Sequence, residues 1–101
     1  MRKMRTKIGS RIGAVLEADA ETIHFIGFGI YSGDEIPPAD VSPMLHDIGL
    51  SNPKLTMDDG QIAWGCECWW APEERAKQMI GDRRIVMVDM VDKRKCAKEE
   101  A

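Results

Sequence analysis

The residues with the clearest chemical potential in this sequence are two cysteines that flank a glutamate, Cys66-Glu67-Cys68. On a strand, residues two apart point to the same side, so both thiols would face one way, and His24 or His46 could add a nitrogen ligand for a metal. Zinc sites, however, usually space paired cysteines by about two to four residues. We therefore interpret both cysteines as buried structural residues and predict no metal and no cofactor.

Glu67 points away from the thiols on the same predicted strand, and Trp69 shares its side. A carboxylate beside a tryptophan can line a pocket as an acid, a base or a hydrogen-bond acceptor. The competing interpretation is a solvent-facing pair on an open sheet. One hypothesis built on this residue is a small enzyme, with Glu67 and either Asp34 or Glu35 as acid and base.

Arg83 and Arg84 form the compact basic element outside the chain ends. Paired arginines at the start of a strand can clamp a phosphate or a carboxylate, because each guanidinium donates hydrogen bonds in a planar fork. The competing interpretation is a surface ion pair between Asp82 and Arg84, or contact with acidic residues elsewhere in the domain.

The carboxylates at predicted turns could together hold a hard cation, but turn chemistry already explains the Gly33-Asp34 and Asp59-Gly60 pairs. Nucleophilic catalysis has little support, since the sequence contains two histidines and no Gly-x-Ser-x-Gly, Walker or dinucleotide-binding glycine pattern. We predict no catalytic residue.

Two strands that must position these residues are predicted over residues 11–18 and 22–31. Alternation along the second strand places Ile26, Phe28 and Ile30 on one face, and Phe25, Gly27, Gly29 and Tyr31 on the other. The two glycines leave a shallow trough, where an aromatic ring or another backbone can approach. This trough is our candidate for a ligand pocket or a subunit interface.

Two short helices are predicted from their capping residues. The first lies between an N-cap at Ser42 and a left-handed C-cap at Gly49. Its apolar stripe consists of Met44, Leu45 and Ile48. The second begins at Pro72 and closes at Gly81.

A hairpin is predicted at Asp59-Gly60, a favoured two-residue turn, followed by one strand over residues 61–70. In this register Asp58 faces Gln61, and the next pairs are Met57 with Ile62, Thr56 with Ala63, and Leu55 with Trp64. The apolar residues then share one face with Cys66, Cys68 and Trp70, while Glu67 and Trp69 lie on the opposite face.

A last strand is predicted over residues 84–91, inside the sheet because residues 85–88 are apolar on both faces. The order β-β-α-β-β-α-β predicts an α+β fold, in which five strands form a mainly antiparallel curled sheet or partial barrel with two short helices. The predicted organisation is a basic N-terminal arm (residues 1–7), a single domain (residues 8–91) and a charged C-terminal tail (residues 92–101), which we expect to be a frayed helical turn or disordered.

Charge is divided unevenly, with a net +5 over residues 1–11, −11 over residues 12–74 and +3 over residues 75–101. The acidic middle disfavours duplex nucleic acid as a partner. Basic ends that dock on an acidic neighbour would favour a homo-oligomer, and two solvated tails are the alternative. With no secretion signal, and no apolar run near the roughly 20 residues of a membrane span, we predict a cytoplasmic protein without a membrane partner.

Four segments together carry a resemblance: Ile8-Gly9-Ser10-Arg11-Ile12-Gly13-Ala14, Gly29-Ile30-Tyr31-Ser32-Gly33-Asp34-Glu35-Ile36-Pro37, Trp64-Gly65-Cys66-Glu67-Cys68-Trp69-Trp70 and Ile80-Gly81-Asp82-Arg83-Arg84. Over residues 8–90 the sequence resembles a group of small uncharacterised proteins encoded in phage and bacterial or prophage genomes. No activity or site is assigned to that group. The resemblance therefore implies only a context, in which small accessory proteins bind a host protein or sequester a metabolite.

Our leading hypothesis is a non-enzymatic small binding protein that works as a homo-oligomer and takes either a small ligand, such as a nucleotide-type signal, or a host protein. The ligand-binding residues predicted for it are Phe25, Tyr31, Asp34, Glu67, Trp69, Arg83 and Arg84. The alternative is an acidic protein-binding inhibitor that mimics nucleic acid. The small enzyme described above ranks third.

Overall fold

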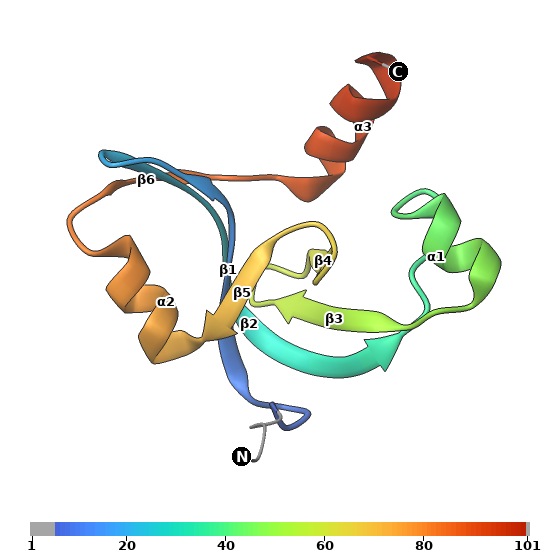
Figure 1. The fold of residues 1–101 in the computed structure, drawn as a ribbon. Helices are drawn as coiled ribbons and strands as arrows, with labels where there is room; N and C mark the ends of the chain where they lie inside the picture. The colour runs from blue at the N-terminus through green and yellow to red at the C-terminus, as the bar shows by residue number, and fades with distance from the viewer. Residues whose placement is uncertain (1–5, 101) are drawn as a thin grey trace.

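The computed structural model describes residues 6–100, with side chains described through residue 95. In chain order these residues form β1 (Arg11–Ala18), β2 (Thr22–Glu35), α1 (Pro43–Ile48), β3 (Asn52–Met57), β4 (Ile62–Trp64), β5 (Trp69–Pro72), α2 (Glu73–Ile80), β6 (Arg84–Met87) and α3 (Met90–Glu100). The fold is α+β, a curled and unclosed, mainly antiparallel sheet with three short helices (Figure 1). Residues 1–5 of the predicted basic arm, and Ala101, lie outside the described residues.

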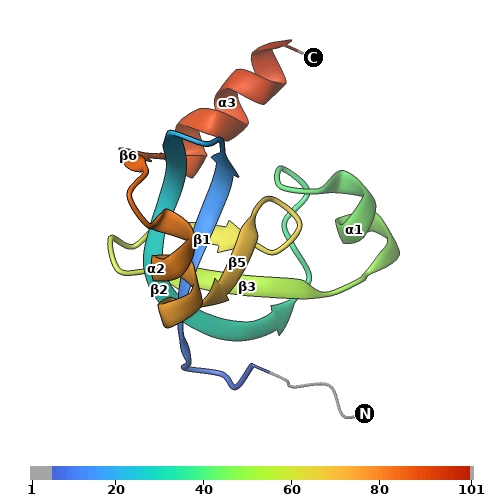
Figure 2. The same cartoon turned by 60° about the vertical axis from the view of Figure 1, so that its left-hand side comes forward.

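The long strand β2 organises the sheet, whose order is β4-β3-β2-β1-β5. β1 occupies one edge of β2, and the other edge is shared between β3, along its second half, and β6, which runs parallel to its first half. β2 bends strongly between these two partners (Figure 2). The β1–β2 turn is held by Asp19, which accepts hydrogen bonds from the backbone N–H groups of Glu21 and Thr22, and these bonds lower the pKa of Asp19.

The predicted alternation of side chains along β2 is wrong at its centre. Val15 of β1 pairs with Phe25 and Ala14 with Gly27, so Ile26 is an extra residue, and Gly27 has a φ of 147°. Beyond the bulge the faces are exchanged: Phe25 and Phe28 pack in one apolar cluster, whereas Ile26 and Tyr31 pack in the other. A bulge changes which face a residue occupies, and binary patterning alone does not reveal it.

Gly29 lies where the sequence predicted that another backbone could approach. A Cβ atom at this position would stand 2.2 Å from the backbone oxygen of Thr56 and 2.6 Å from Cα of Met57. The trough beside Gly29 is therefore filled by β3. Gly13 plays the same part on β1, where a Cβ atom would lie 2.5 Å from Cβ of Ala76 in α2.

The β3–β4 hairpin is present, but its predicted register is wrong by one residue. The pairs are Thr56 with Ile62, Leu55 with Ala63 and Lys54 with Trp64. The backbone N–H of Asp58 donates to the backbone oxygen of Phe28 in β2 at 2.9 Å, so Asp58 does not pair with Gln61. Met57 pairs with Gln61 instead, across a longer loop in which the N–H of Gly60 donates to the oxygen of Met57. Ala63 thus faces the core and is fully buried, while Ile62 is only half-buried.

The single strand predicted over residues 61–70 is in fact two strands joined by a turn. β4 ends at Trp64, residues 65–68 turn, and β5 then pairs with β1. Gly65 donates to the backbone oxygen of Pro53 and Glu67 to that of Trp64, and these bonds replace the predicted strand ladder. This break explains why the sheet has six strands where five were predicted.

The chain end also differs from its prediction. β6 is shorter than predicted and lies at an edge of the sheet, because β2 is its one strand partner among the described residues. A third helix, α3, covers most of the segment predicted as a frayed turn or disorder. The side chain of Gln61 secures its start: it accepts a hydrogen bond from the N–H of Met90 at 3.0 Å and donates to the oxygen of Val88 at 3.2 Å.

Two apolar clusters form the core, one on each side of the curled sheet. The first contains Ile12, Ala14, Ile26, Leu55, Met57, Ala63, Val88 and Met90. The second contains Val15, Ile23 and Phe25, with Phe28, Met79 and Ile80 packed against it. None of the helices within residues 6–100 is long and apolar enough to cross a membrane.

Candidate functional site

The predicted ligand-binding residues lie in separate parts of the fold. Phe25 is a core residue, 3% exposed, with its ring edge-on to Phe28 at a centroid distance of 4.9 Å. Tyr31 and Asp34 do meet, because the Tyr31 hydroxyl donates to the Asp34 carboxylate and the Tyr31 ring stacks on Trp70 at 5.5 Å. The ring stacking ties the second half of β2 to β5.

Glu67 is engaged by a charged partner that the sequence did not suggest. Arg94 of α3 donates from Nε and Nη2 to the two carboxylate oxygens, at 2.8 and 2.7 Å. The backbone N–H of Trp64 also donates to this carboxylate, at 3.1 Å. The hydrogen bond to Glu67 raises the pKa of Arg94. With both oxygens occupied, Glu67 acts as an anchor for α3, and little of its carboxylate is left for acid–base chemistry.

The turn at residues 65–68 sets the positions of Trp69 and the two cysteines. Trp69 stands on β5 opposite Val15, and 38% of it is exposed. Cys66 is exposed instead of buried, which corrects our interpretation, whereas Cys68 packs against the first core cluster. Burial raises the pKa of both thiols, that of Cys68 to about 12. Among the side chains described here, no group of three or more His, Cys, Asp and Glu side chains is arranged to hold a metal ion.

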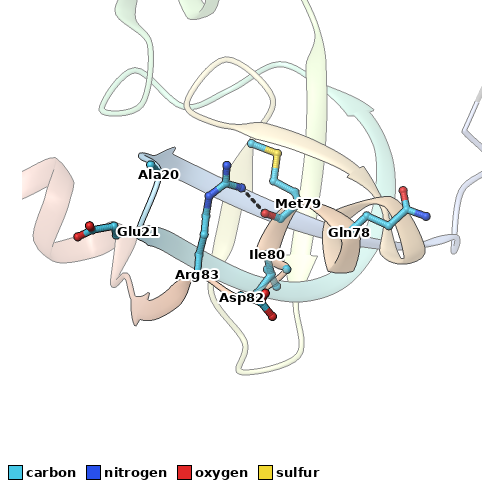
Figure 3. A pocket seen from close by; sticks show the side chains of 8 residues that line it. Ala20, Glu21, Gln78, Met79, Ile80, Asp82 and Arg83 are labelled. Carbon is cyan, nitrogen blue, oxygen red and sulfur yellow. Dashed lines mark hydrogen bonds between the residues drawn. The ribbon is translucent and has the colours of Figure 1, made fainter.

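Arg84 begins β6, and Arg83, directly before it, lines a hollow of about 530 Å³. Its lining residues are Ala20, Glu21, Gln78, Met79, Ile80, Gly81, Asp82 and Arg83. Figure 3 shows the Arg83 guanidinium turned toward the backbone oxygen of Met79, to which it donates, while Glu21 and Gln78 point outward in different directions. The Nε atom of Arg83 is buried without a partner among the described residues, out of reach of solvent. Arg83 therefore caps the end of α2, and the polar groups of this hollow do not converge.

A second ion-pair group, also missed by the sequence reading, centres on Arg11. Its guanidinium donates to both carboxylate oxygens of Asp58, at 2.7 and 2.8 Å, and to Glu73 at 3.1 Å. Hydrogen bonding to Asp58 raises the pKa of Arg11 and lowers that of Asp58. Arg11 thus joins β1, the β3–β4 turn and α2.

One surface with binding character is a protruding segment that we call the α1 arm, residues 36–51. None of the residues of α1 is buried, and the helix stands apart from the sheet in both ribbon views (Figures 1 and 2). Four large apolar side chains of the arm are exposed, by 50% to 68%: Ile36, Met44, Ile48 and Leu50. The sequence correctly predicted a capped helix with an apolar stripe, but the absence of a covering element is a tertiary property.

These features define a small α+β domain in which Arg11, Glu67 and Arg94 serve structural contacts and the α1 arm presents exposed apolar side chains. Comparisons of this chain with known protein families, with curated proteins and with solved structures found no match. Its function is therefore argued below from its own surfaces.

Proposed function

We propose that this chain is a non-enzymatic binding protein that recognises another protein through the α1 arm. The observation that carries the proposal is the exposure of Met44 and Ile48, 68% and 59%, on one helix. They are four residues apart and so share one face. Ile36 and Leu50, also exposed, lie in the segments on either side of the helix. Several exposed large apolar side chains on one protruding segment are typical of a protein contact site.

The arm carries several hydrogen bonds of its own that favour this helical conformation. Ser42 accepts a hydrogen bond from the N–H of Leu45 at 3.3 Å, and Gly49 adopts the left-handed conformation with φ 70°. The N–H of Leu50 donates to the backbone oxygen of Leu45 at 3.1 Å, which completes a Schellman motif at the C-terminus of α1. Nδ1 of His46 lies 3.1 Å from the backbone oxygen of Pro37, and this contact joins α1 to the start of the arm. A preorganised helix loses less conformational entropy on binding than a flexible segment.

Charge limits the kind of partner that fits this arm. Four exposed carboxylates lie in or beside it: Asp34, Glu35, Asp40 and Asp47. Lys54 approaches Glu35 at 3.4 Å, and the other three have no ion pair with a described basic side chain. The partner surface that fits is an apolar groove with a basic rim, which accepts the helix as an amphipathic ligand. In the phage or prophage context that the resemblance implies, that partner would be a host protein.

The small-ligand version of the binding hypothesis has less support. A small-molecule site needs a concave pocket with a few convergent polar groups. The predicted residues are divided between the core, the Glu67–Arg94 pair and the end of α2, and the hollow beside Arg83 is lined by diverging polar side chains. Native mass spectrometry of the purified protein tests this version, because a retained ligand would appear as added mass.

The test of the main proposal uses photo-crosslinking followed by direct binding. A photoreactive residue replaces Met44 in one protein and Glu74, an exposed residue of α2, in the control. We expect a crosslinked protein with the first position only. That protein, purified, should bind the natural chain and lose at least tenfold in affinity for Met44→Ser/Ile48→Ser, which corresponds to about 1.4 kcal/mol. Equal binding of the natural and double-variant chains would refute the α1 arm as the contact element.

The second candidate function, an acidic inhibitor that mimics nucleic acid, is favoured by the carboxylates around the same arm. The two candidates differ in their dependence on salt. Binding dominated by charge should weaken steeply as salt rises, whereas apolar contacts should persist. Binding that survives high salt and is lost in Met44→Ser/Ile48→Ser supports the apolar contact, and the opposite pattern supports mimicry.

A further inference from the structure

The outer edge of β6 carries backbone groups that no described residue satisfies. The backbone N–H groups of Arg84 and Val88 point toward β2. They donate to the backbone oxygens of Glu21, at 2.8 Å, and Phe25, at 3.0 Å. Because donors alternate along a strand, the N–H and C=O groups of Ile85 and Met87 point to the opposite side. β2 is the one strand that pairs with β6 among residues 6–100, so this edge is open.

The outer edge of β4, by contrast, is closed by side-chain hydrogen bonds. On β4 the outward oxygen of Ile62 accepts from Arg94 at 2.9 Å, and the outward N–H of Trp64 donates to Glu67 at 3.1 Å. β5 ends in Pro72 and turns at once into α2. Natural edge strands are commonly protected in such ways, by covering, charge or proline. β6 carries one charge, Arg84 at its start, and no proline or covering strand along residues 85–87 among the described residues.

The side chains of this open edge are also suited to pairing. Ile85 and Met87 are 47% and 62% exposed and lie on the same face of the strand. The strand contains no lysine, proline or bulge. An exposed apolar edge of this kind is a template for the addition of another strand.

We propose that a second copy of this chain occupies this edge, with the two β6 strands antiparallel about a two-fold axis at Val86. In this register Ile85 of each copy faces Met87 of the other. Since both residues direct their backbone groups outward, each facing pair exchanges hydrogen bonds, and four apolar side chains meet on one face. Two other two-fold registers would lose the Ile85–Met87 pairs. A register centred on Ile85 would bring the two Ile85 side chains opposite each other, and one centred on Met87 would place Ile85 opposite Asp89.

Charge at the two ends of β6 supports a copy of the same chain as the occupant. The strand begins at Arg84 and is followed by Asp89 and Asp92. Antiparallel pairing brings the basic start of one copy beside the acidic end of the other, at both ends of the interface. A parallel arrangement would place like charges together. This surface is distinct from the α1 arm, which lies at the other side of the molecule (Figures 1 and 2).

The first test measures the oligomeric state of the full chain against concentration. One short strand makes a small interface, so we expect a dimer to be populated near about 100 μM and to dissociate on dilution in sedimentation velocity. Hydrogen exchange at the amides of Ile85 and Met87 should slow as concentration rises, because these amides become bonded in the dimer. A chain that remains monomeric at about 500 μM overturns the proposal.

The second test is specific for the register and uses two double variants. Ile85→Lys/Met87→Lys places like charges opposite each other and should be monomeric. Ile85→Glu/Met87→Lys places opposite charges together in the proposed register only, and should recover a salt-sensitive dimer. Val91→Lys, a change of a residue 57% exposed beyond the strand, should dimerise as the natural chain does.

Both double variants replace exposed side chains, so we expect them to remain folded. A cooperative unfolding transition of each variant in urea checks this expectation. A dimer that survives in Ile85→Lys/Met87→Lys, or that fails to return in Ile85→Glu/Met87→Lys, overturns the proposed pairing. Neither result affects the proposed function, because Met44 and Ile48 are unchanged in these proteins.

Discussion

Arg94 and Glu67 form an ion pair with two hydrogen bonds that closes the outer edge of β4 and fastens α3 to the sheet. The same guanidinium donates to the backbone oxygen of Ile62, and the same carboxylate accepts from the N–H of Trp64. The two side chains are 20% and 12% exposed, so the pair is largely shielded from water.

Arg94→Met should lower the free energy of unfolding by about 1–3 kcal/mol, because it leaves the largely shielded Glu67 carboxylate without its charged donor. Urea unfolding followed by circular dichroism measures the loss. Lys93→Met, a change at the exposed neighbouring position, should shift stability by less than about 0.5 kcal/mol. In Glu67→Gln/Arg94→Met the loss should be smaller than the sum of the two single losses, and additive losses would contradict direct coupling.

Gly29→Ala should destabilise the protein by about 2–3 kcal/mol, at the upper end of overpacking effects. The new Cβ atom would lie 2.2 Å from the backbone oxygen of Thr56, and neither strand can move without breaking its ladder. Gly49→Asn is the matched control, since nothing lies within 4 Å of a Cβ atom there and asparagine tolerates the left-handed conformation. It should cost less than about 1 kcal/mol. A comparable loss in both variants would argue against the close β2–β3 approach.

Cys66 should react with iodoacetamide much faster than Cys68 in the folded protein. Burial raises the pKa of Cys68 to about 12, and its thiol donates to the backbone oxygen of Trp64. Cys66 is exposed, although its pKa is also raised by desolvation. Mass spectrometry of the digested protein gives the rate at each site. In urea the two rates should converge, and equal rates in the folded protein would place both thiols in the same environment.

Asp58→Asn should lower the urea midpoint at neutral pH but have little effect in acid. The Arg11 guanidinium holds the pKa of Asp58 below its ordinary value of 3.8, so the carboxylate stabilises the folded state above that pH. This stabilisation is lost as the pH falls through the lower folded-state pKa. The difference between the natural and variant midpoints should therefore narrow progressively below about pH 4.

The control for this pH series is Asp47→Asn, a change of an exposed carboxylate on α1 with no ion pair among the described side chains. It should leave the urea midpoint nearly unchanged at every pH. A constant gap between Asp58→Asn and the natural chain, from neutral to strongly acidic pH, would contradict the ionic character of the Arg11–Asp58 contact.

Local signals in the sequence were reliable where neighbouring residues alone decide the structure. Ser42 and Gly49 cap α1 as predicted, Gly81 follows α2, and β1 spans the predicted residues. Caps and tight turns depend on side chains and backbone angles within a few residues, so sequence spacing is sufficient to place them.

Register and strand continuity failed at identifiable points. The bulge at Ile26 and the one-residue difference at Asp58 each depend on a hydrogen bond or packing contact with a distant strand. Alternation of apolar residues appeared consistent with the wrong hairpin register, because Leu55 and Met57 are buried in either case. A pattern with period two cannot distinguish a straight strand from one that turns at Cys66.

The sequence by itself determined the α+β class, most of the elements and the uneven distribution of charge. Only the tertiary structure decided which side chains meet: it split the strand that carries Cys66 and Cys68, joined Glu67 to Arg94, and left Met44 uncovered. The reason is physical. Backbone propensity and capping act over a few residues, whereas ion pairs, edge protection and exposure depend on which distant segments the folded sheet brings together.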